Sequence, residues 1–144
     1  MCSAERLSLS MKRRIAIFGP PGVGKSTLIK LAIKRGIKAF DFEDLPEEEV
    51  KEIFKEVSAD IVLYGAAGLQ PYDFPQDVEL VLVLPPKTVY LKRVKERDIA
   101  NPAKADQNYL EWYDGYTRNN NHYHKIISGT GDSDKVLDKI LENL

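Results

Sequence analysis

FGPPGVGKST, residues 18–27, is the stretch of this sequence that says most about its fold. The apolar run RRIAIF before it (residues 13–18) predicts a buried strand, and KSTLIKLAIKR after its glycines (residues 25–35) has the spacing of an amphipathic helix. A strand that passes through a glycine-rich turn into a helix is the context in which G-x-x-x-x-G-K-[ST] forms a phosphate-binding loop. Four residues occupy the fixed positions of that pattern: Gly19, Gly24, Lys25 and Ser26.

Each fixed position of the pattern has a physical reason. Glycine lets the backbone bend so that successive N–H groups point at phosphate oxygens, and the helix N-terminus adds a favourable field. We expect Lys25 to reach the β- and γ-phosphates of a nucleotide and Ser26 to ligate magnesium. The residues expected to contact the nucleotide are Gly19, Pro21, Gly22, Val23, Gly24, Lys25, Ser26 and Thr27. The alternative, a strand–helix turn with a solvated lysine, is disfavoured by the strand and helix on either side.

Strand and helix patterns alternate along the rest of the chain. Further apolar runs predict four strands, at residues 37–42, 60–65, 78–84 and 125–127. Continuously apolar strands that alternate with helices predict an α/β fold, in which a parallel sheet is covered on both faces. We expect one domain at residues 12–144, preceded by a flexible tail at residues 1–11.

The composition excludes several classes of protein. The 144 residues are 43% hydrophobic and 30% charged, which suits a single globular domain. The net charge of −1 gives no global positive field that would attract nucleic acid or an anionic membrane. A single cysteine excludes an internal disulfide, and no apolar run approaches the roughly 20 residues that span a bilayer. We expect a cytoplasmic protein, either a monomer or a small homo-oligomer.

Two carboxylates stand at the end of the second predicted strand. Asp41 and Glu43 are two residues apart, so their side chains share a face while the chain stays extended. Proteins with parallel sheets place their sites outside the carboxyl ends of the strands. We predict that Asp41 holds a magnesium-bound water or accepts a proton from an attacking hydroxyl, and that Glu43 lies on the acceptor side. In the alternative interpretation both residues only cap the helix that follows.

Glycines and arginines mark further positions at the same edge of the sheet. GAAG, residues 65–68, ends the third strand, where Gly65 and Gly68 let the backbone approach an acceptor; a tight turn without a ligand explains them equally well. Arg93 and Arg97 are four apart, on one face of the helix after the fourth strand. They either stabilise the charge of a transferring phosphoryl group or belong to an ordinary solvated face.

Residues 98–124 are polar and aromatic, with few aliphatic side chains. Four aromatic residues recur there at helical spacing: Tyr109, Trp112, Tyr113 and Tyr116. They either pack a helix onto the domain or line a pocket, and packing is the favoured interpretation. His122 and His124 are two apart, but without a third nearby ligand they do not predict a zinc site.

The phosphate loop, the acidic strand end, GAAG and RVKER (residues 93–97) together resemble the P-loop kinases of small molecules, above all shikimate kinase and the adenylate kinase group. The resemblance implies a three-layer α/β/α P-loop NTPase fold with a five-stranded parallel sheet in the order 2-3-1-4-5. It implies ATP and Mg²⁺ as cofactors, and a lid at residues 98–124. It also implies that SGTGDS, residues 128–133, packs the adenine base. The implied catalytic residues are Lys25, Asp41, Arg93 and Arg97, with Ser26 and Asp41 at the metal.

The acceptor side departs from those kinases, which grip an anionic acceptor with arginine between the second and third strands. Residues 42–75 contain no arginine here, only Lys51 and Lys55. This departure argues against a nucleoside monophosphate or shikimate as acceptor. The leading prediction is an ATP-dependent phosphotransferase that acts on a small-molecule hydroxyl or a nucleotide-like acceptor. A polynucleotide end also fits an open site, although no basic stripe supports it.

Two other functions stay open at the level of sequence. One is a nucleotide-binding regulatory module with little or no transfer activity, which the reduced acceptor region favours. The other is a GTPase switch, but the chain lacks Asn-Lys-x-Asp and also lacks Asp-x-x-Gly after the third strand. The kinase interpretation therefore comes first and the regulatory module second.

Overall fold

The computed structural model describes residues 13–20, 24–43, 45–55, 59–66, 69–100, 109–130 and 132–142, with only the backbone at residues 97–100. Its strands are β1 (Arg13–Phe18), β2 (Lys38–Asp41), β3 (Ile61–Gly65), β4 (Val78–Val83) and β5 (Lys125–Ile127). They form one parallel sheet in the order β2-β3-β1-β4-β5. The predicted sheet order is therefore confirmed, and each strand matches its predicted range to within one residue at either end. The predicted tail lies outside the described residues.

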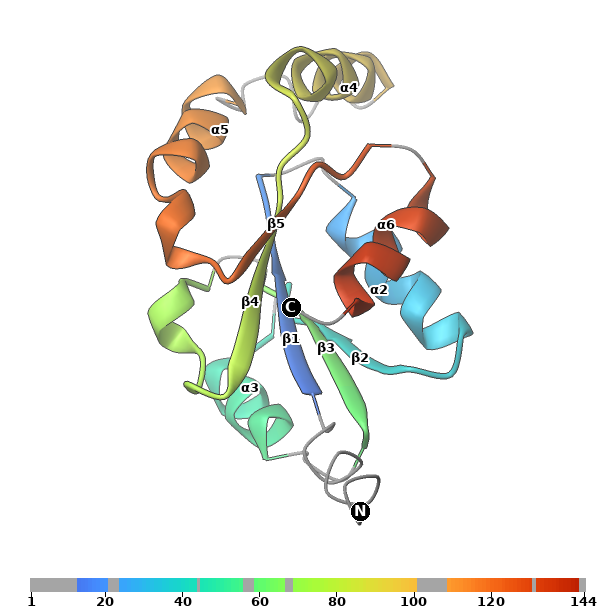
Figure 1. The fold of residues 1–144 in the computed structure, drawn as a ribbon, viewed down its shortest axis with the longest axis vertical. Helices are drawn as coiled ribbons and strands as arrows, with labels where there is room; N and C mark the ends of the chain where they lie inside the picture. Colours follow the sequence, from blue (N-terminus) through green and yellow to red (C-terminus); the bar gives the residue numbers. More distant parts are fainter. Residues whose placement is uncertain are drawn as a thin grey trace, which may run out of the picture.

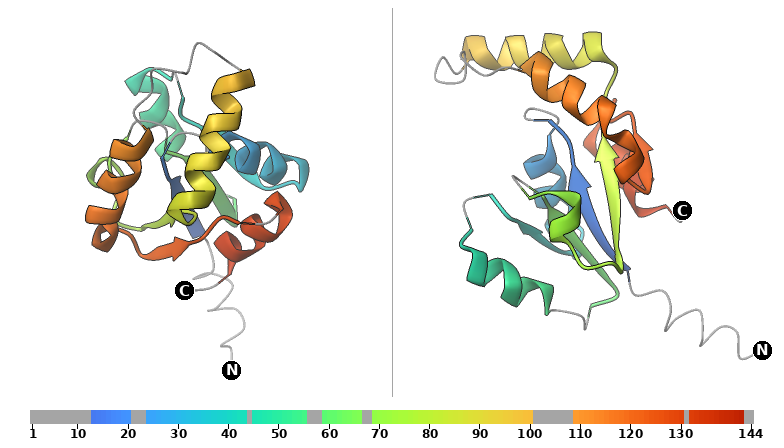
Figure 2. Two further views of the ribbon diagram at one scale, coloured as in Figure 1. Left: turned by 90° about the horizontal axis from the view of Figure 1, so that it is seen from above. Right: turned by 90° about the vertical axis from the view of Figure 1, so that its left-hand side faces the viewer.

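Helices on both faces complete the layers within the described part of the chain. They are α2 (Lys25–Lys34), α3 (Glu47–Phe54), α4 (Lys87–Ala100), α5 (Tyr109–Arg118) and α6 (Ser133–Leu141), with short 3₁₀ helices η1 (Pro71–Asp73) and η3 (Asn120–His122). Figures 1 and 2 show α2 and α6 together on one side of the sheet and α3 on the other, with α4 and α5 beyond the carboxyl ends of the strands. This arrangement confirms the predicted α/β/α layers.

The face of the sheet under α2 and α6 carries a mainly aliphatic core. β1 contributes Ile15 and Ile17 to it, because alternate residues of a strand share a face. The two helices cover this face with buried side chains: Leu28, Ile29, Ala32, Val136, Leu137 and Ile140. Arg35, at the end of α2, forms ion pairs with Asp134 and Asp138 of α6 at 2.7 and 2.8 Å. The two helices therefore contact each other as well as the sheet.

The opposite face, under α3, is filled largely by aromatic rings. Phe74 lies at the centre of this group, with its ring centroid 5.3 to 6.2 Å from those of four others: Phe18, Phe42, Phe54 and Tyr64. Further aromatic side chains pack against the group from β2, from α5 and from the segment before β5: Phe40, Tyr116 and Tyr123. Because α3 has only eight residues, loop and 3₁₀ segments cover much of this face.

Helix α5 is fixed to α4 by its aromatic residues. Tyr109 and Tyr113 are buried in the core under α2 and α6, where their rings contact that of Tyr90. The hydroxyl of Tyr113 donates a 2.6 Å hydrogen bond to the carbonyl of Pro85, and burial raises the pKa of this hydroxyl. The prediction that these aromatic residues pack a helix onto the domain is confirmed for both tyrosines.

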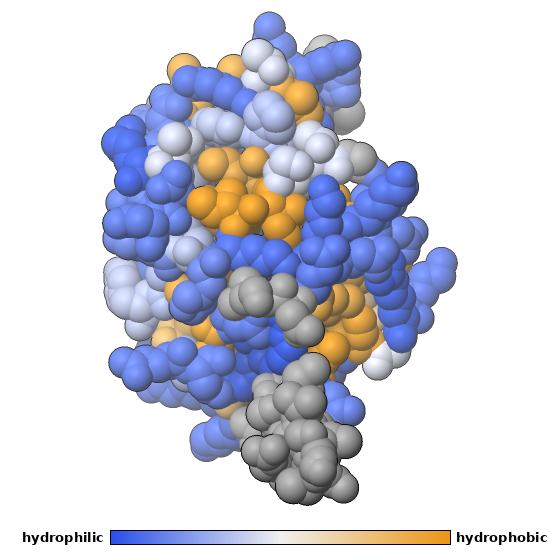
Figure 3. All heavy atoms as spheres, viewed as in Figure 1, coloured by the Kyte–Doolittle hydropathy of each residue, from blue (hydrophilic) through white to orange (hydrophobic). Residues whose placement is uncertain are grey.

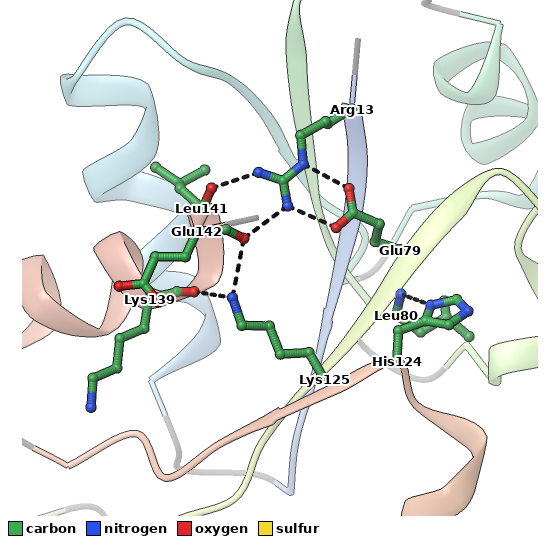
Figure 4. Close-up of polar contacts among 8 residues, drawn as sticks. All are labelled: Arg13, Glu79, Leu80, His124, Lys125, Lys139, Leu141 and Glu142. Atoms are coloured by element: carbon green, nitrogen blue, oxygen red, sulfur yellow. Dashed lines mark hydrogen bonds and ion pairs between the residues drawn. The ribbon is translucent and has the colours of Figure 1, made fainter. Parts of the chain in front are cut away.

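The start of β1 and the end of α6 are joined by hydrogen bonds (Figure 4). Arg13 donates to both carboxylate oxygens of Glu79 on β4 at 2.7 Å, and this bonding raises the pKa of the arginine. The same guanidinium donates to the carbonyls of Leu141 and Glu142 at 2.5 and 3.2 Å. Two of the carbonyls that the end of a helix leaves unpaired are thereby satisfied, which explains an arginine at the first residue of a central strand.

The surface in Figure 3 is mostly hydrophilic, with an apolar area near its middle where β5 passes in Figure 1. Ile126 in the middle of β5 is 49% exposed, as is common for a side chain on an edge strand. Among the helices of the described residues, none has the length and apolar character needed to cross a membrane.

Candidate functional site

Helix α2 begins at the lysine of the glycine-rich loop. The residue before it, Gly24, has φ of 92° and ψ of 25°, a left-handed conformation that glycine adopts without a steric penalty. As a glycine, this N-cap residue has no side chain to cap the helix, and the first turn of α2 contains no acidic residue. The N–H groups in the first turn of a helix, with the positive end of its dipole, suit an anion. Pro21, Gly22 and Val23 lie outside the described residues.

The Lys25 side chain lies along the loop that precedes it. Its Nζ donates to the carbonyl of Gly19 at 2.5 Å and to that of Pro20 at 3.3 Å. Gly19 and Pro20 are buried, whereas the lysine is partly exposed. The ammonium group is therefore held over the backbone that runs from β1 into α2. Thr27, in the first turn of α2, is exposed.

The hydroxyl of Ser26 connects α2 to the end of β2. Ser26 Oγ donates a 2.7 Å hydrogen bond to Asp41 Oδ2 across a separation of 15 residues. The other carboxylate oxygen, Asp41 Oδ1, accepts from the backbone N–H of Glu43 at 3.1 Å. Both oxygens of Asp41 are thus engaged, and the Glu43 side chain beside it is exposed. The sequence predicted each of these residues at the site but did not predict the bond between Ser26 and Asp41.

Gly65 lies directly beside Asp41, because β2 and β3 pair in that register. A Cβ atom at Gly65 would lie 3.2 Å from Ile29 Cγ1, 3.5 Å from Asp41 Oδ1 and 3.6 Å from Asp41 Cα. The carbonyl of Gly65 accepts a hydrogen bond from the backbone N–H of Phe42 at 3.0 Å. The close approach of strand, helix and carboxylate is by itself a sufficient reason for glycine at this position. Gly68 lies outside the described residues.

The arginine on α4 contacts a different part of the same edge. Arg93 donates to the carbonyl of Gly129 at 3.3 Å, in the loop between β5 and α6. Gly129 is buried with φ of 67°, and a Cβ atom there would lie 2.5 Å from Val83 Cγ1. This packing reason for glycine was not visible in the sequence, because Val83 is 46 positions away. The side chain of Arg97 is outside the described part of the chain.

The pair formed by Ser26 and Asp41 offers oxygen ligands of the kind that Mg²⁺ prefers. Within the described residues no cluster of three or more His, Cys, Asp or Glu side chains forms a metal site. A hydroxyl and a carboxylate nevertheless fit magnesium, because this ion usually keeps several waters and takes its other ligands from substrate phosphates. The donor set is therefore suited to magnesium together with a bound nucleotide.

Comparisons by sequence and by structure give different results. Neither a protein-family model nor a curated protein matches the sequence. Among solved structures, shikimate kinase from Acinetobacter baumannii in complex with shikimate is 22% identical with a TM-score of 0.60, over 93% of this chain and 94% of that one. A gluconokinase from Sinorhizobium meliloti 1021 is 15% identical with a TM-score of 0.57, over 91% of this chain and 90% of that one.

A third solved structure with the same fold is deoxyadenosine kinase from M. mycoides, with dCMP and dCDP bound. It is 14% identical with a TM-score of 0.54, over 89% of this chain and 96% of that one. Identities of this size establish the shared fold and leave the reaction of this chain to be argued from its own residues. The chain therefore has the fold of the P-loop kinases, including the strand order that its resemblance to them implied.

Proposed function

We propose that this protein is an ATP- and magnesium-dependent phosphotransferase that acts on a small-molecule hydroxyl or a nucleotide-like acceptor. The observation that carries the proposal is the 2.7 Å bond between Ser26, in the first turn of α2, and Asp41 at the end of β2. It joins the two groups that a phosphoryl-transfer site needs side by side, an anion-binding helix end and a metal-binding carboxylate. The kinase fold supports the same interpretation.

The nucleotide would be held by the N-terminus of α2 and by Lys25. Backbone N–H groups there suit phosphate oxygens, and the ammonium group is within reach because it already lies over the loop. Binding would exchange its bonds to the carbonyls of Gly19 and Pro20 for charge-assisted bonds to phosphate, which are stronger. Magnesium, held by Ser26 and Asp41, would supply charge neutralisation at the phosphates.

The two carboxylates at the end of β2 have separate roles in this proposal. Asp41 already accepts hydrogen bonds at both oxygens, so it is suited to hold Ser26 and the metal in position. Glu43 is exposed two residues further on, and we assign it the acceptor side, where a carboxylate can accept the proton of an attacking hydroxyl. A direct role for Arg93 and Arg97 in stabilising charge, and closure of residues 98–124, stay predictions.

The basic residues of α3 bear on which acceptor this site takes. Lys51 lies 3.6 Å from Glu47 and Lys55 lies 2.8 Å from Glu52, so both ammonium groups pair with carboxylates of their own helix. These pairs lie on the exposed surface. An anionic acceptor would therefore have to compete for them, which favours an acceptor without a phosphate or carboxylate near this helix.

Nucleotide titration tests the proposal. ATP, ADP and GTP with Mg²⁺ are titrated by calorimetry into wild type, Lys25→Ala and the control Lys30→Ala, which removes an exposed lysine from the next turn of α2. We expect wild type and Lys30→Ala to bind ATP alike and Lys25→Ala to lose at least about tenfold in affinity, because a charge-assisted bond is lost. Equal ATP affinity in all three proteins would contradict the assignment of the loop.

A second candidate function is a nucleotide-binding regulatory module with little transfer activity. The short helix α3 favours it, because the interval between β2 and β3 holds only these eight helical residues among those described. ADP release with and without a panel of hydroxylated metabolites separates the two functions. Acceptor-dependent ADP release would establish the kinase, whereas nucleotide binding without it across the panel would favour the module.

A further inference from the structure

A histidine ring takes the place of a backbone acceptor where β5 begins. The backbone N–H of His124 donates to the carbonyl of Leu80 on β4 at 2.8 Å. In return, the N–H of Leu80 donates to Nδ1 of the His124 ring, also at 2.8 Å (Figure 4). One residue thus pairs with both backbone groups of Leu80, directly before the regular pairing of Val81 with Lys125.

This contact exists only in one protonation state. Neutral imidazole has one ring nitrogen that donates and one that accepts, and here Nδ1 has to be the acceptor, which places the proton on Nε2. Protonation turns both nitrogens into donors, and the Leu80 N–H then faces another N–H group. His124 is exposed, so the proton can be exchanged with solvent. Imidazole is the side chain that changes charge between pH about 5 and 8.

The charged groups on neighbouring elements are already paired. On β4 and the turn before it, Glu79 is bonded to Arg13 of β1 and Asp77 to Arg14 of the same strand. On β5, the ammonium of Lys125 donates to the carbonyls of Lys139 and Glu142 at the end of α6. Each of these two carboxylates is therefore neutralised by an arginine, and a charged His124 ring would have to compete with that arginine for either one.

The residues on either side of His124 contact two elements of the candidate site. The residue before it, Tyr123, has its ring centroid 5.1 Å from that of Phe18, the last residue of β1 before the phosphate loop. The strand after it leads to Gly129, whose carbonyl accepts from Arg93. The segment around His124 is therefore connected to the end of β1 through Tyr123 and to α4 through Gly129.

We propose that His124 is a pH-sensitive clasp, which fastens the start of β5 to Leu80 while its ring is neutral and releases it when Nδ1 gains a proton. The proposal rests on hydrogen-bond geometry and is independent of the proposed phosphotransferase activity. It makes the connection from η3 to β5 a part of the fold that responds when the ring of His124 gains a proton.

Nuclear magnetic resonance of the whole protein tests this directly, because the chain has only two histidines. At pH 8 we expect the His124 ring to carry its proton on Nε2 and the Leu80 amide to be protected from hydrogen exchange. On titration to pH 5, that protection should fall by about tenfold, after correction for the intrinsic pH dependence of exchange, since one hydrogen bond is lost.

Three variants make the test specific. His124→Asn keeps an acceptor oxygen at the δ1 position but does not titrate, so the Leu80 amide should stay protected at both pH values. His124→Ala should show low protection at both, and His122→Asn, which changes the other histidine, should behave as wild type. A proton on Nδ1 at pH 8, or Leu80 protection in wild type that does not change with pH, would overturn the proposal.

Discussion

The cores on the two faces of the sheet differ in their side chains. Under α2 and α6 the core is mainly aliphatic, and the two covering helices have ten and nine residues. Under α3 the core is mainly aromatic, and one helix of eight residues shares the cover with the segments around Phe74 and Tyr123. The first face carries the helix that begins at the phosphate loop. The second face carries Phe42, which stands in the sequence between Asp41 and Glu43 of the candidate site.

The difference follows from the number of covering helices. Two helices, of ten and nine residues, lie over the first face, whereas a single helix of eight residues lies over the second. A helix of eight residues is about 12 Å long and a six-residue strand extends about 20 Å, so α3 alone leaves part of its face uncovered. Rings with a large apolar area are side chains that can close the remaining space. The face under α2 and α6 thus has a regular helix-on-sheet arrangement, while the face under α3 is closed largely by aromatic side chains.

The largest change in the free energy of unfolding is expected when a ring is removed from the aromatic core under α3. Phe74→Ala should lower the free energy of unfolding by about 3–5 kcal/mol, because a ring that contacts four others is replaced by a cavity. Leu137→Ala on the aliphatic face should cost about 2–5 kcal/mol. Urea denaturation measures both, with Tyr72→Ala as a control because Tyr72 is 82% exposed. A Phe74 variant as stable as the Tyr72 variant would show that the rings do not form a core.

A glycine substitution examines how tightly the aliphatic face is packed. Gly129→Ala should cost about 2–4 kcal/mol, because it combines a positive φ with a Cβ that meets Val83. Gly36→Ala is the matched control: its φ is 84°, with nothing within 4 Å of a Cβ, so only the backbone cost of about 1 kcal/mol is expected. In a double-mutant cycle Val83→Ala should relieve part of the cost at Gly129. Equal costs for the two glycines would mean that the contact with Val83 is easily relaxed.

The smallest effect concerns alkaline pH and the tyrosines of the aromatic face. Burial raises the pKa values of Tyr116 and Tyr123 above the ordinary value of about 10. Between about pH 10 and these raised values, the unfolded chain binds fewer protons than the folded one, so stability should fall as pH rises above 10. Denaturation at pH 9, 10 and 11 measures this decline, and Tyr123→Phe should make it shallower. An unchanged slope in that variant would show that Tyr123 ionises freely in the folded protein.

Local sequence was sufficient for the strands and the helix after the phosphate loop, whereas the order of the sheet was implied only by the resemblance to the P-loop kinases. Apolar runs and helical spacing reflect backbone geometry, which repeats over a few residues and can be read without knowing what lies opposite. The same holds for Gly24, whose left-handed conformation belongs to the loop itself. The packing of Tyr109 and Tyr113 was also predictable, because large rings at helical spacing have a large apolar area to bury.

Contacts between distant segments were not predictable from pattern. Neither the bond from Ser26 to Asp41 nor the contact of Arg93 with Gly129 has a local signature, since each depends on how two elements dock. Gly65 shows the limit clearly: the sequence left open whether it faces a ligand, and the structure shows a close approach to Ile29 and Asp41. The ring of His124 at β4 is a further example, because a histidine two residues from another gives no sign of its partner.

The sequence by itself determined that this chain forms a parallel α/β sheet with a phosphate loop between its first strand and the following helix, because short-range backbone geometry and apolar periodicity encode both. Only the tertiary structure decided that Ser26 is bonded to Asp41, that aromatic rings fill the face under α3, and that His124 pairs with Leu80. Side-chain directions and element lengths decide these contacts, and they act only once the whole sheet is assembled.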